Sequence, residues 1–175
     1  MSDILGWAHD ASDIPERGLE VERRASAPEL ARLVEALDLM SCDSLLVRYR
    51  VKPVTGGGYR VSGNLEARLA QHCIVSLEPV AAVAASPIEV EYWAAERRAG
   101  EVEEGEIEAL SAAEIEPLVN GRLDVGRVVF EQLAAALDPY PRKPEAEFTP
   151  PPEAPPGGGV GGPFAALARL KVDKP

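Results

Sequence analysis

Two runs of alternating apolar and polar residues, joined by three consecutive glycines, constrain the fold of this chain more than any other feature. The first run is Leu45–Lys52, and the second extends from Tyr59 to Arg68. Alternation with a period of two is typical of a strand with one buried face, and glycines at 56–58 allow the positive φ angles of a hairpin connection. The sequence therefore predicts an antiparallel hairpin. Its inward-facing positions are Leu45, Val47, Tyr49, Val51, Val61, Gly63, Leu65 and Ala67.

Three further strands are predicted around this hairpin. Gly18–Arg23 alternates apolar and charged residues, as a half-buried strand does, and Pro87–Trp93 shows the same pattern. Cys73–Leu77 is a short apolar run that we also expect to be a strand.

Two helices are predicted from their capping residues. Ser26 and Glu29 have the spacing of a capping box, which opens a helix whose apolar stripe contains Leu30, Leu33, Val34 and Leu37. Asp124 can cap a second helix, which Pro139 must end. The buried side of this second helix is expected to be Val125, Val128, Val129, Leu133, Ala136 and Leu137.

These elements predict an α+β fold: a mainly antiparallel β-sheet with two principal packed helices and a Pro/Gly-rich C-terminal tail ending in a short helix. Residues 145–162 lack apolar periodicity and read as a linker. Phe164, Leu167 and Leu170 then share one helical face, in a segment too short to be helical alone in water. We expect one domain over 1–144, the linker over 145–162 and an amphipathic segment over 163–175, docked on the domain or on a partner.

Composition narrows the class of protein. The 175 residues carry a net charge of −11, which disfavours a free-standing binder of duplex nucleic acid. The 46% hydrophobic content permits a packed core. The first ten residues lack a secretory pattern, and no apolar run approaches the roughly 18 residues of a membrane span. We therefore expect a cytoplasmic protein without a membrane partner, whose Cys42 and Cys73 are reduced thiols.

One positive block interrupts the acidic chain, because residues 41–72 carry a net charge of +3 and residues 73–141 one of −10. Its cations occupy alternate, outward-facing positions of the hairpin: Arg48, Arg50, Lys52, Arg60 and Arg68. This basic row contacts RNA phosphates in one interpretation. In the other, its members pair across the sheet with Glu66, Glu89 and Glu91, which is common on exposed antiparallel faces.

No set of residues indicates catalysis or a cofactor. The possible zinc ligands are His9, Cys42, His72 and Cys73, and the adjacent His72 and Cys73 would point to opposite faces of a strand. No nucleophile with a base and an orienting group can be nominated. The acidic run Glu101–Glu116 lacks a calcium-loop pattern and is interpreted as a solvated loop leading to a short helix. We expect no enzyme activity, no cofactor and no small-molecule substrate.

The stretch Asp138–Pro144 follows the second helix and contains three prolines. In one interpretation it is a stiff helix exit with Tyr140 packed back on the core. In the other it is a preorganised recognition element, in which Tyr140, Arg142 and Lys143 bind an anionic or aromatic surface.

Several stretches together resemble the YceD family, which is named for large ribosomal RNA subunit accumulation, in its variant with a Pro/Gly tail. The strongest are residues 61–80 (VSGNLEARLAQHCIVSLEPV), 120–144 (NGRLDVGRVVFEQLAAALDPYPRKP) and 163–171 (PFAALARLK), with a weaker match over 22–39. Many family members carry a Cys-x-x-Cys here, but Ser76 stands where the second cysteine would be. This departure weakens a metal or redox role.

The resemblance implies a cytoplasmic, non-enzymatic factor needed for normal levels of large-subunit (23S) ribosomal RNA. Two binding modes remain open. In the first, the basic row contacts large-subunit ribosomal RNA or a pre-ribosomal particle. In the second, the chain is an acidic adaptor without direct RNA contact: Glu101–Glu116 binds a basic ribosomal protein or assembly factor, and Phe164, Leu167 and Leu170 insert into a groove.

Overall fold

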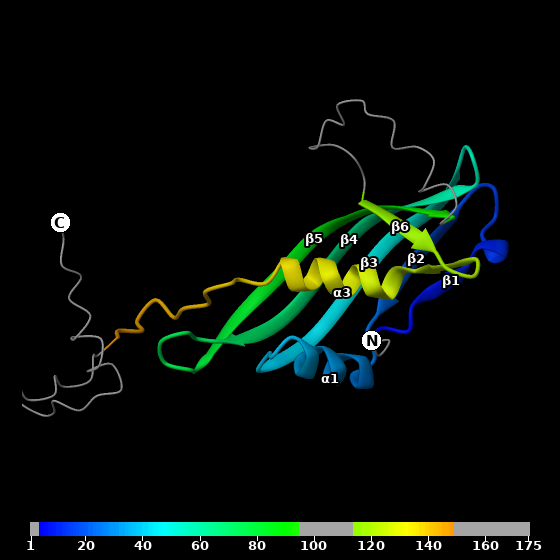
Figure 1. Ribbon diagram of the computed structural model, residues 1–175. Coiled ribbons are helices and arrows are strands. Elements are labelled where there is room, and N and C mark those ends of the chain that lie inside the picture. Colours follow the sequence, from blue (N-terminus) through cyan, green and yellow to red (C-terminus); the bar gives the residue numbers. More distant parts are fainter. Residues whose placement is uncertain (1–3, 95–113, 149–175) are drawn as a thin grey trace, which may run out of the picture.

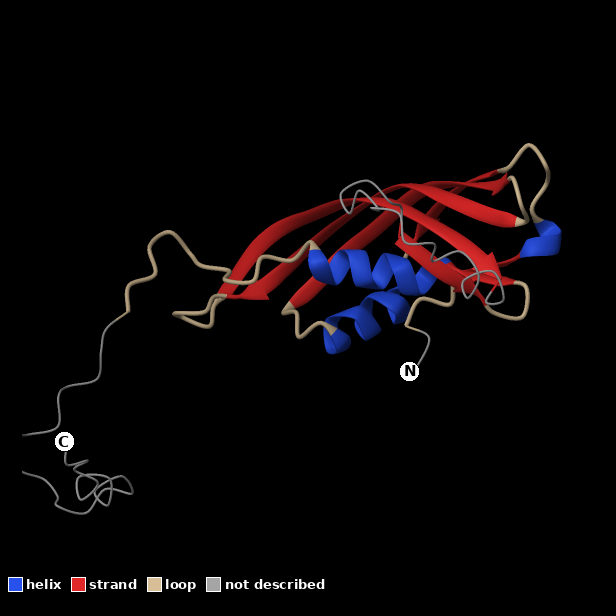
Figure 2. Cartoon of the chain, turned by 45° about the horizontal axis from the view of Figure 1, so that its top comes forward, coloured by secondary structure: helices blue, strands red, loops and turns tan. Residues whose placement is uncertain are grey.

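The computed structural model of the protein describes residues 4–94 and 114–148 (Figure 1). In this part of the chain, a curved β-sheet carries both helices on one face (Figure 2). The predicted α+β class, with a mainly antiparallel sheet and two packed helices, is confirmed. The predicted linker beyond residue 148 and the short terminal helix, with Phe164, Leu167 and Leu170, lie outside the described residues.

The main sheet has five strands in the order β2-β3-β4-β5-β6. Their bounds are Leu19–Arg24 (β2), Ser41–Val54 (β3), Gly58–His72 (β4), Pro79–Ala94 (β5) and Glu114–Leu118 (β6). The first four pair antiparallel, whereas β6 pairs parallel to β5. A second, two-stranded sheet joins β1 (Ala8–Asp10) to β7 (Arg122–Asp124), and a 3-10 turn covers Ala11–Asp13.

The predicted hairpin is β3 and β4, which are longer than the sequence pattern indicates. Every inward-facing position named above is buried except Gly63, which is half-buried. Gly63 pairs with Tyr49 on β3, and a Cβ built on it would collide with the Arg48 carbonyl oxygen and lie 2.6 Å from Tyr49 Cα. A side chain at this position would therefore force the two strands apart.

Helix α1 (Ala27–Ala36) begins with the predicted capping box. The Ser26 N–H donates to Glu29 Oε2 at 2.7 Å, and Ser26 Oγ contacts the same oxygen at 2.7 Å. The second carboxylate oxygen of Glu29 accepts the Trp7 indole N–H at 2.8 Å. One carboxylate thus caps the helix and anchors the N-terminal segment to it.

Helix α3 (Val125–Ala135) is capped as expected, since Asp124 Oδ1 accepts the Arg127 N–H at 3.0 Å. The helix ends at Ala135, before Pro139. On its buried side, Gly126 approaches the N-terminal segment, and its N–H donates to the Trp7 carbonyl at 2.8 Å.

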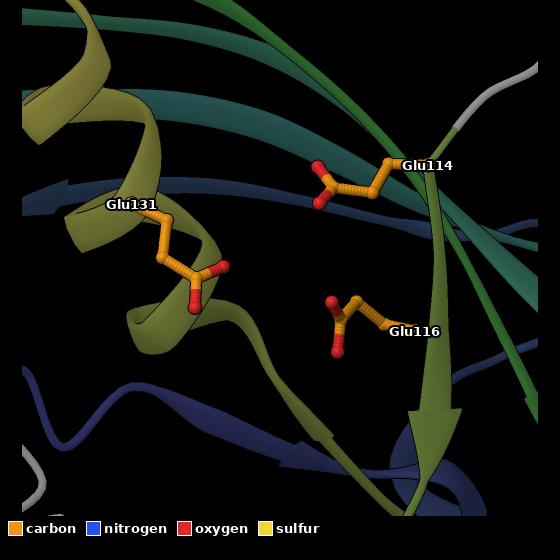
Figure 3. Close-up of side chains that lie close together, drawn as sticks. All are labelled: Glu114, Glu116 and Glu131. Atoms are coloured by element: carbon orange, nitrogen blue, oxygen red, sulfur yellow. The ribbon is translucent and has the colours of Figure 1, made fainter.

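Two predictions about the β4–β5 region were wrong. Cys73–Leu77 is a turn rather than a strand, because the Cys73 N–H closes onto the Glu78 carbonyl at 2.8 Å and Leu77 has a φ of 61°. β5 begins at Pro79, well before the predicted Pro87. Of the acidic run, only the last three residues are described, and they begin β6, which faces α3 (Figure 3).

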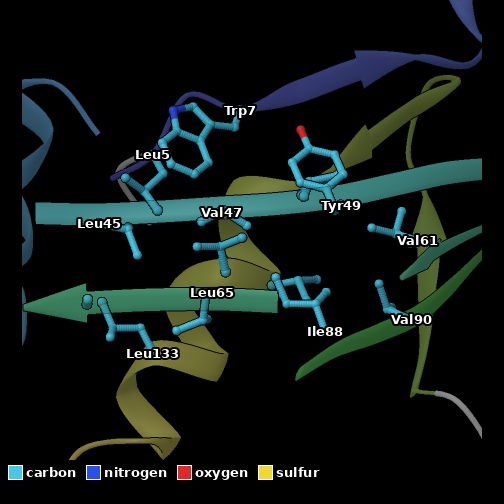
Figure 4. Close-up of a cluster of buried hydrophobic side chains, with 14 of the residues drawn as sticks. Leu5, Trp7, Leu45, Val47, Tyr49, Val61, Leu65, Ile88, Val90 and Leu133 are labelled. Atoms are coloured by element: carbon cyan, nitrogen blue, oxygen red, sulfur yellow. The ribbon is translucent and has the colours of Figure 1, made fainter. Parts of the chain in front are cut away.

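The hydrophobic core lies between the sheet and the two helices (Figure 4). It combines side chains from β3, β4 and β5 with Leu133 of α3 and Leu33 of α1. Leu5 and Trp7 of the N-terminal segment are buried in the same cluster, at 1% and 3% exposure. No helix in the described part of the chain is long and apolar enough to span a bilayer.

Candidate partner-binding surfaces

The cations of the predicted basic row share the outer face of the sheet, the face opposite the helices. All five side chains are exposed, and Lys52 lies directly across from Arg60 in the β3–β4 register. The prediction that they share one face is confirmed.

Carboxylates lie beside most of these cations. The four ion pairs are Arg48–Glu22 (Nε to Oε2, 2.7 Å), Arg60–Glu91 (Nη2 to Oε1, 2.6 Å), Arg50–Glu20 (Nη1 to Oε1, 3.6 Å) and Arg68–Glu66 (Nε to Oε1, 4.0 Å). Glu91 on β5 thus pairs across the sheet as one interpretation expected, whereas Glu66 pairs with Arg68 on its own strand, β4. Glu89 has no ion pair within residues 4–94 and 114–148, and β2 supplies Glu20 and Glu22 instead.

The two shortest of these ion pairs lower the pKa of their carboxyls, Glu22 and Glu91. Hydrogen bonds from Arg48 and then Arg24 lower the pKa of Glu22, and the Arg60 hydrogen bond lowers that of Glu91. Among the described residues, Lys52 alone in the basic row lacks a carboxylate partner. At the four arginines of the row, an RNA phosphate would have to compete with a carboxylate that is already bound.

A second surface forms at the far end of the sheet, where residues 138–148, the exit segment, follow α3. This segment is held on the β4–β5 turn, residues 73–78. Gln71 Nε2 donates to the Asp138 carbonyl at 2.9 Å and Gln71 Oε1 accepts the Asp138 N–H at 3.3 Å. The Ile74 N–H donates to the Pro141 carbonyl at 2.9 Å.

Tyr140 lies in the middle of the exit segment and points away from the core. Its side chain is 73% exposed, while its N–H donates to Asp138 Oδ1 at 2.9 Å. The interpretation in which Tyr140 packs back on the core is therefore wrong. Arg142 donates to the Ala146 carbonyl at 2.7 Å and Lys143 pairs with Glu78 at 3.0 Å, so both neighbouring cations have partners.

Four large apolar side chains are exposed on these two contacting segments, and we call them the distal patch: Ile74, Leu77, Tyr140 and Phe148. Leu77 combines 71% exposure with a left-handed backbone. That conformation costs a branched L-residue roughly 1–2 kcal/mol. Such outliers are most common where a chain binds something.

Acidic residues flank the distal patch. Glu78, Asp138, Glu145 and Glu147 are exposed on the same segments, against Arg142 and Lys143. These two segments therefore combine exposed apolar side chains with an excess of negative charge.

The buried Cys73 contacts both the β4–β5 turn and the exit segment. Its side chain is fully buried, and its sulfur accepts the Ser76 N–H at 3.4 Å. Hydrogen bonds from the Ser76 hydroxyl and from the backbone of Lys143, Ser76 and Val75 lower the pKa of the Cys73 thiol to about 6. The sequence predicts a reduced thiol at Cys73 but no such role for it, because the role depends on the distant Lys143.

The other residues considered as zinc ligands lie on separate elements. His9 Nε2 is 2.8 Å from Tyr49 Oη, at the junction of β1 and β3, and burial followed by the nearby Arg23 lowers its pKa. Cys42 is buried near the start of β3, and His72 ends β4.

A carboxylate cluster joins β6 to α3, as Figure 3 shows. Glu114, Glu116 and Glu131 offer oxygens within 4.8 Å of one another, a spacing that could hold a cation. Arg127 already supplies a positive charge there, with Nη2 3.4 Å from Glu116 Oε1 and Nε 2.8 Å from Glu131 Oε1. No local sequence pattern indicates this cluster, because it depends on the parallel β5–β6 pairing.

No family model matches the chain, and neither a curated protein nor a solved structure shows significant similarity to it.

Proposed function

We propose that this chain is a non-enzymatic ribosome biogenesis factor that supports accumulation of 23S ribosomal RNA by binding a basic ribosomal protein through the distal patch. The process follows from the resemblance to the YceD family described above. The observation that carries the binding mode is the exposure of Ile74, Leu77, Tyr140 and Phe148 on two segments fixed to each other.

The distal patch has the properties of a binding site. Its four exposed side chains are large and apolar, and tyrosine is enriched among interface residues that dominate affinity. The exit segment is fixed by the Gln71–Asp138 and Ile74–Pro141 hydrogen bonds, so little conformational entropy is lost when a partner binds.

Charge favours a basic partner. The flanking carboxylates and the net charge of −11 attract a cationic protein and repel bare RNA. Because four of its five cations already contact carboxylates, the basic row supports direct RNA binding less well.

A photo-crosslinking amino acid at position 140 of the full chain tests the proposal in cells. We expect crosslinks to a basic ribosomal protein, and far fewer from the same probe at Ser62, an exposed position in the middle of the outer face. Crosslinks to RNA alone, or equal yields from both positions, would refute the distal patch as the protein-binding site.

Complementation tests the proposed role in accumulation of 23S ribosomal RNA. In cells lacking the protein, the Tyr140→Ala, Leu77→Gly double variant should fail to restore 23S ribosomal RNA, whereas Arg48→Gln, on the outer face, should restore it. Normal 23S levels in cells lacking the protein would contradict the ribosomal role itself.

A further inference from the structure

One border of the main sheet is open over most of its length. β5 lies at this border, and β6 pairs with it only from Val90 to Ala94 (Figure 1). Within residues 4–94 and 114–148, no strand pairs with the outer side of the ten residues Pro79–Ile88. We call this stretch the free edge.

The direction of the backbone groups along the free edge follows from the β4–β5 turn. The Cys73 N–H donates to the Glu78 carbonyl at 2.8 Å, so the backbone groups of Glu78 face β4. In an antiparallel pair these groups alternate sides from residue to residue. Those of Ala81, Val83 and Ala85 therefore face away from β4.

The two prolines of the free edge agree with this assignment. Pro79 and Pro87 fall on the same alternation, where a missing N–H removes no bond to β4, as is usual for proline in a sheet. The Pro87 carbonyl accepts a hydrogen bond from Ser86 Oγ at 3.2 Å rather than from a neighbouring strand. The outward-facing N–H groups of residues 81, 83 and 85 thus lie between two prolines, which have no N–H to donate.

Between its two prolines, the free edge lacks the features that discourage another strand. Natural edges are protected by charges, bulges or prolines within the strand. Pro79–Ile88 contains no charged residue, the β4–β5 register runs through it without a shift, and the Val83 side chain is 63% exposed on the outer face.

We propose that two copies of this chain associate antiparallel along their free edges, about a two-fold axis at Val83. In this register Val83 pairs with Val83 of the second copy, and Ala81 pairs with Ala85 in both directions. Each pair exchanges two N–H···O bonds. Pro79 then lies opposite Pro87, so the ladder ends at both sides where neither chain has a donor.

The symmetry of the free edge selects a second copy over a foreign strand, because Pro79 and Pro87 lie four residues on either side of Val83. Two molecules of charge −11 repel each other, and the uncharged free edge is where they approach at least cost. The two-fold register sets residues 81–85, which are all alanine or valine, against themselves, and brings no like charges together along the paired strands. This inference is independent of the distal patch.

Sedimentation of the full chain over a range of concentrations tests the proposal. We expect a dimer of twice 18.7 kDa for the natural sequence and loss of the dimer in Val83→Lys, which sets two ammonium groups side by side. Ser62→Lys adds the same charge on the central strand β4 and should stay dimeric. Association should tighten with salt, because screening weakens the repulsion between the acidic chains.

A disulfide tests the register without relying on the folding of Val83→Lys. Paired Cα atoms here lie about 5.5 Å apart, within the range that a disulfide spans. Val83→Cys should form a covalent dimer on mild oxidation, and Ser62→Cys, on the central strand β4, should not. The native Cys42 and Cys73 are buried and should not contribute to crosslinking. A monomer at all concentrations, weaker association in high salt, or equal crosslinking of the two variants would overturn the proposal.

Discussion

Gly63→Ala gives the most direct test of how the sheet is packed. The new methyl group would lie 2.6 Å from Tyr49 Cα and 2.7 Å from Tyr49 Cβ, and would overlap the Arg48 carbonyl oxygen. Ordinary contacts between such atoms begin near 3.4 Å. Relief requires separation of β3 from β4 in the middle of the sheet, because the opposing atoms belong to the backbone or are attached directly to it.

We expect this overpacking to lower the free energy of unfolding by about 3 kcal/mol, the upper part of the usual range for an added methyl group. With a urea slope of about 2 kcal/mol/M, the unfolding midpoint should fall by about 1.5 M. Ser62→Ala, the exposed neighbour on the same strand, should change stability by less than about 0.5 kcal/mol. A loss below about 1 kcal/mol for Gly63→Ala would refute the close approach of the two strands.

Three further outcomes are expected, each measured by urea unfolding. Ser26→Ala should cost about 1 kcal/mol through loss of the α1 cap, and an unchanged midpoint would count against the capping box. Leu77→Gly should change stability by less than about 1 kcal/mol, because release from a left-handed backbone offsets the few contacts of a 71% exposed side chain; a larger loss would show that Leu77 packs on the fold. The stability advantage of the natural chain over Cys73→Ala should fall as pH drops from about 9 to about 6, because the folded thiol has a pKa near 6 against an ordinary 9.0; a pH-independent difference would contradict thiolate stabilisation.

The elements that could be predicted are those whose signals are local. The hairpin follows from alternation and glycines, α1 from the Ser26–Glu29 capping box, and α3 from the single cap Asp124. The first half of β5 has no such signal: alanine and serine have weak strand preference, and its stretch from Val80 to Ser86 shows little alternation. Pairing with the long β4 makes it a strand.

The candidate sites divide in the same way. The basic row could be found from alternation alone, and its neutralisation by Glu66 and Glu91 was one of the two interpretations. Pairing with Glu20 and Glu22 required the β2–β3 register. The distal patch depends on contact between residues 73–78 and 138–148, which no local pattern of the sequence encodes.

The pairing of β1 with β7 has a consequence for synthesis of the protein. His9 lies opposite Leu123, so the first strand waits for a partner made more than a hundred residues later. At about 5–20 residues per second, a ribosome needs roughly 6 to 23 s to reach it. The central hairpin can form in the meantime, but the Trp7 carbonyl lacks its Gly126 N–H donor until α3 emerges, and the core around Leu5 stays incomplete. Closure of the core is therefore a late event, during which the nascent chain exposes an apolar surface to chaperones.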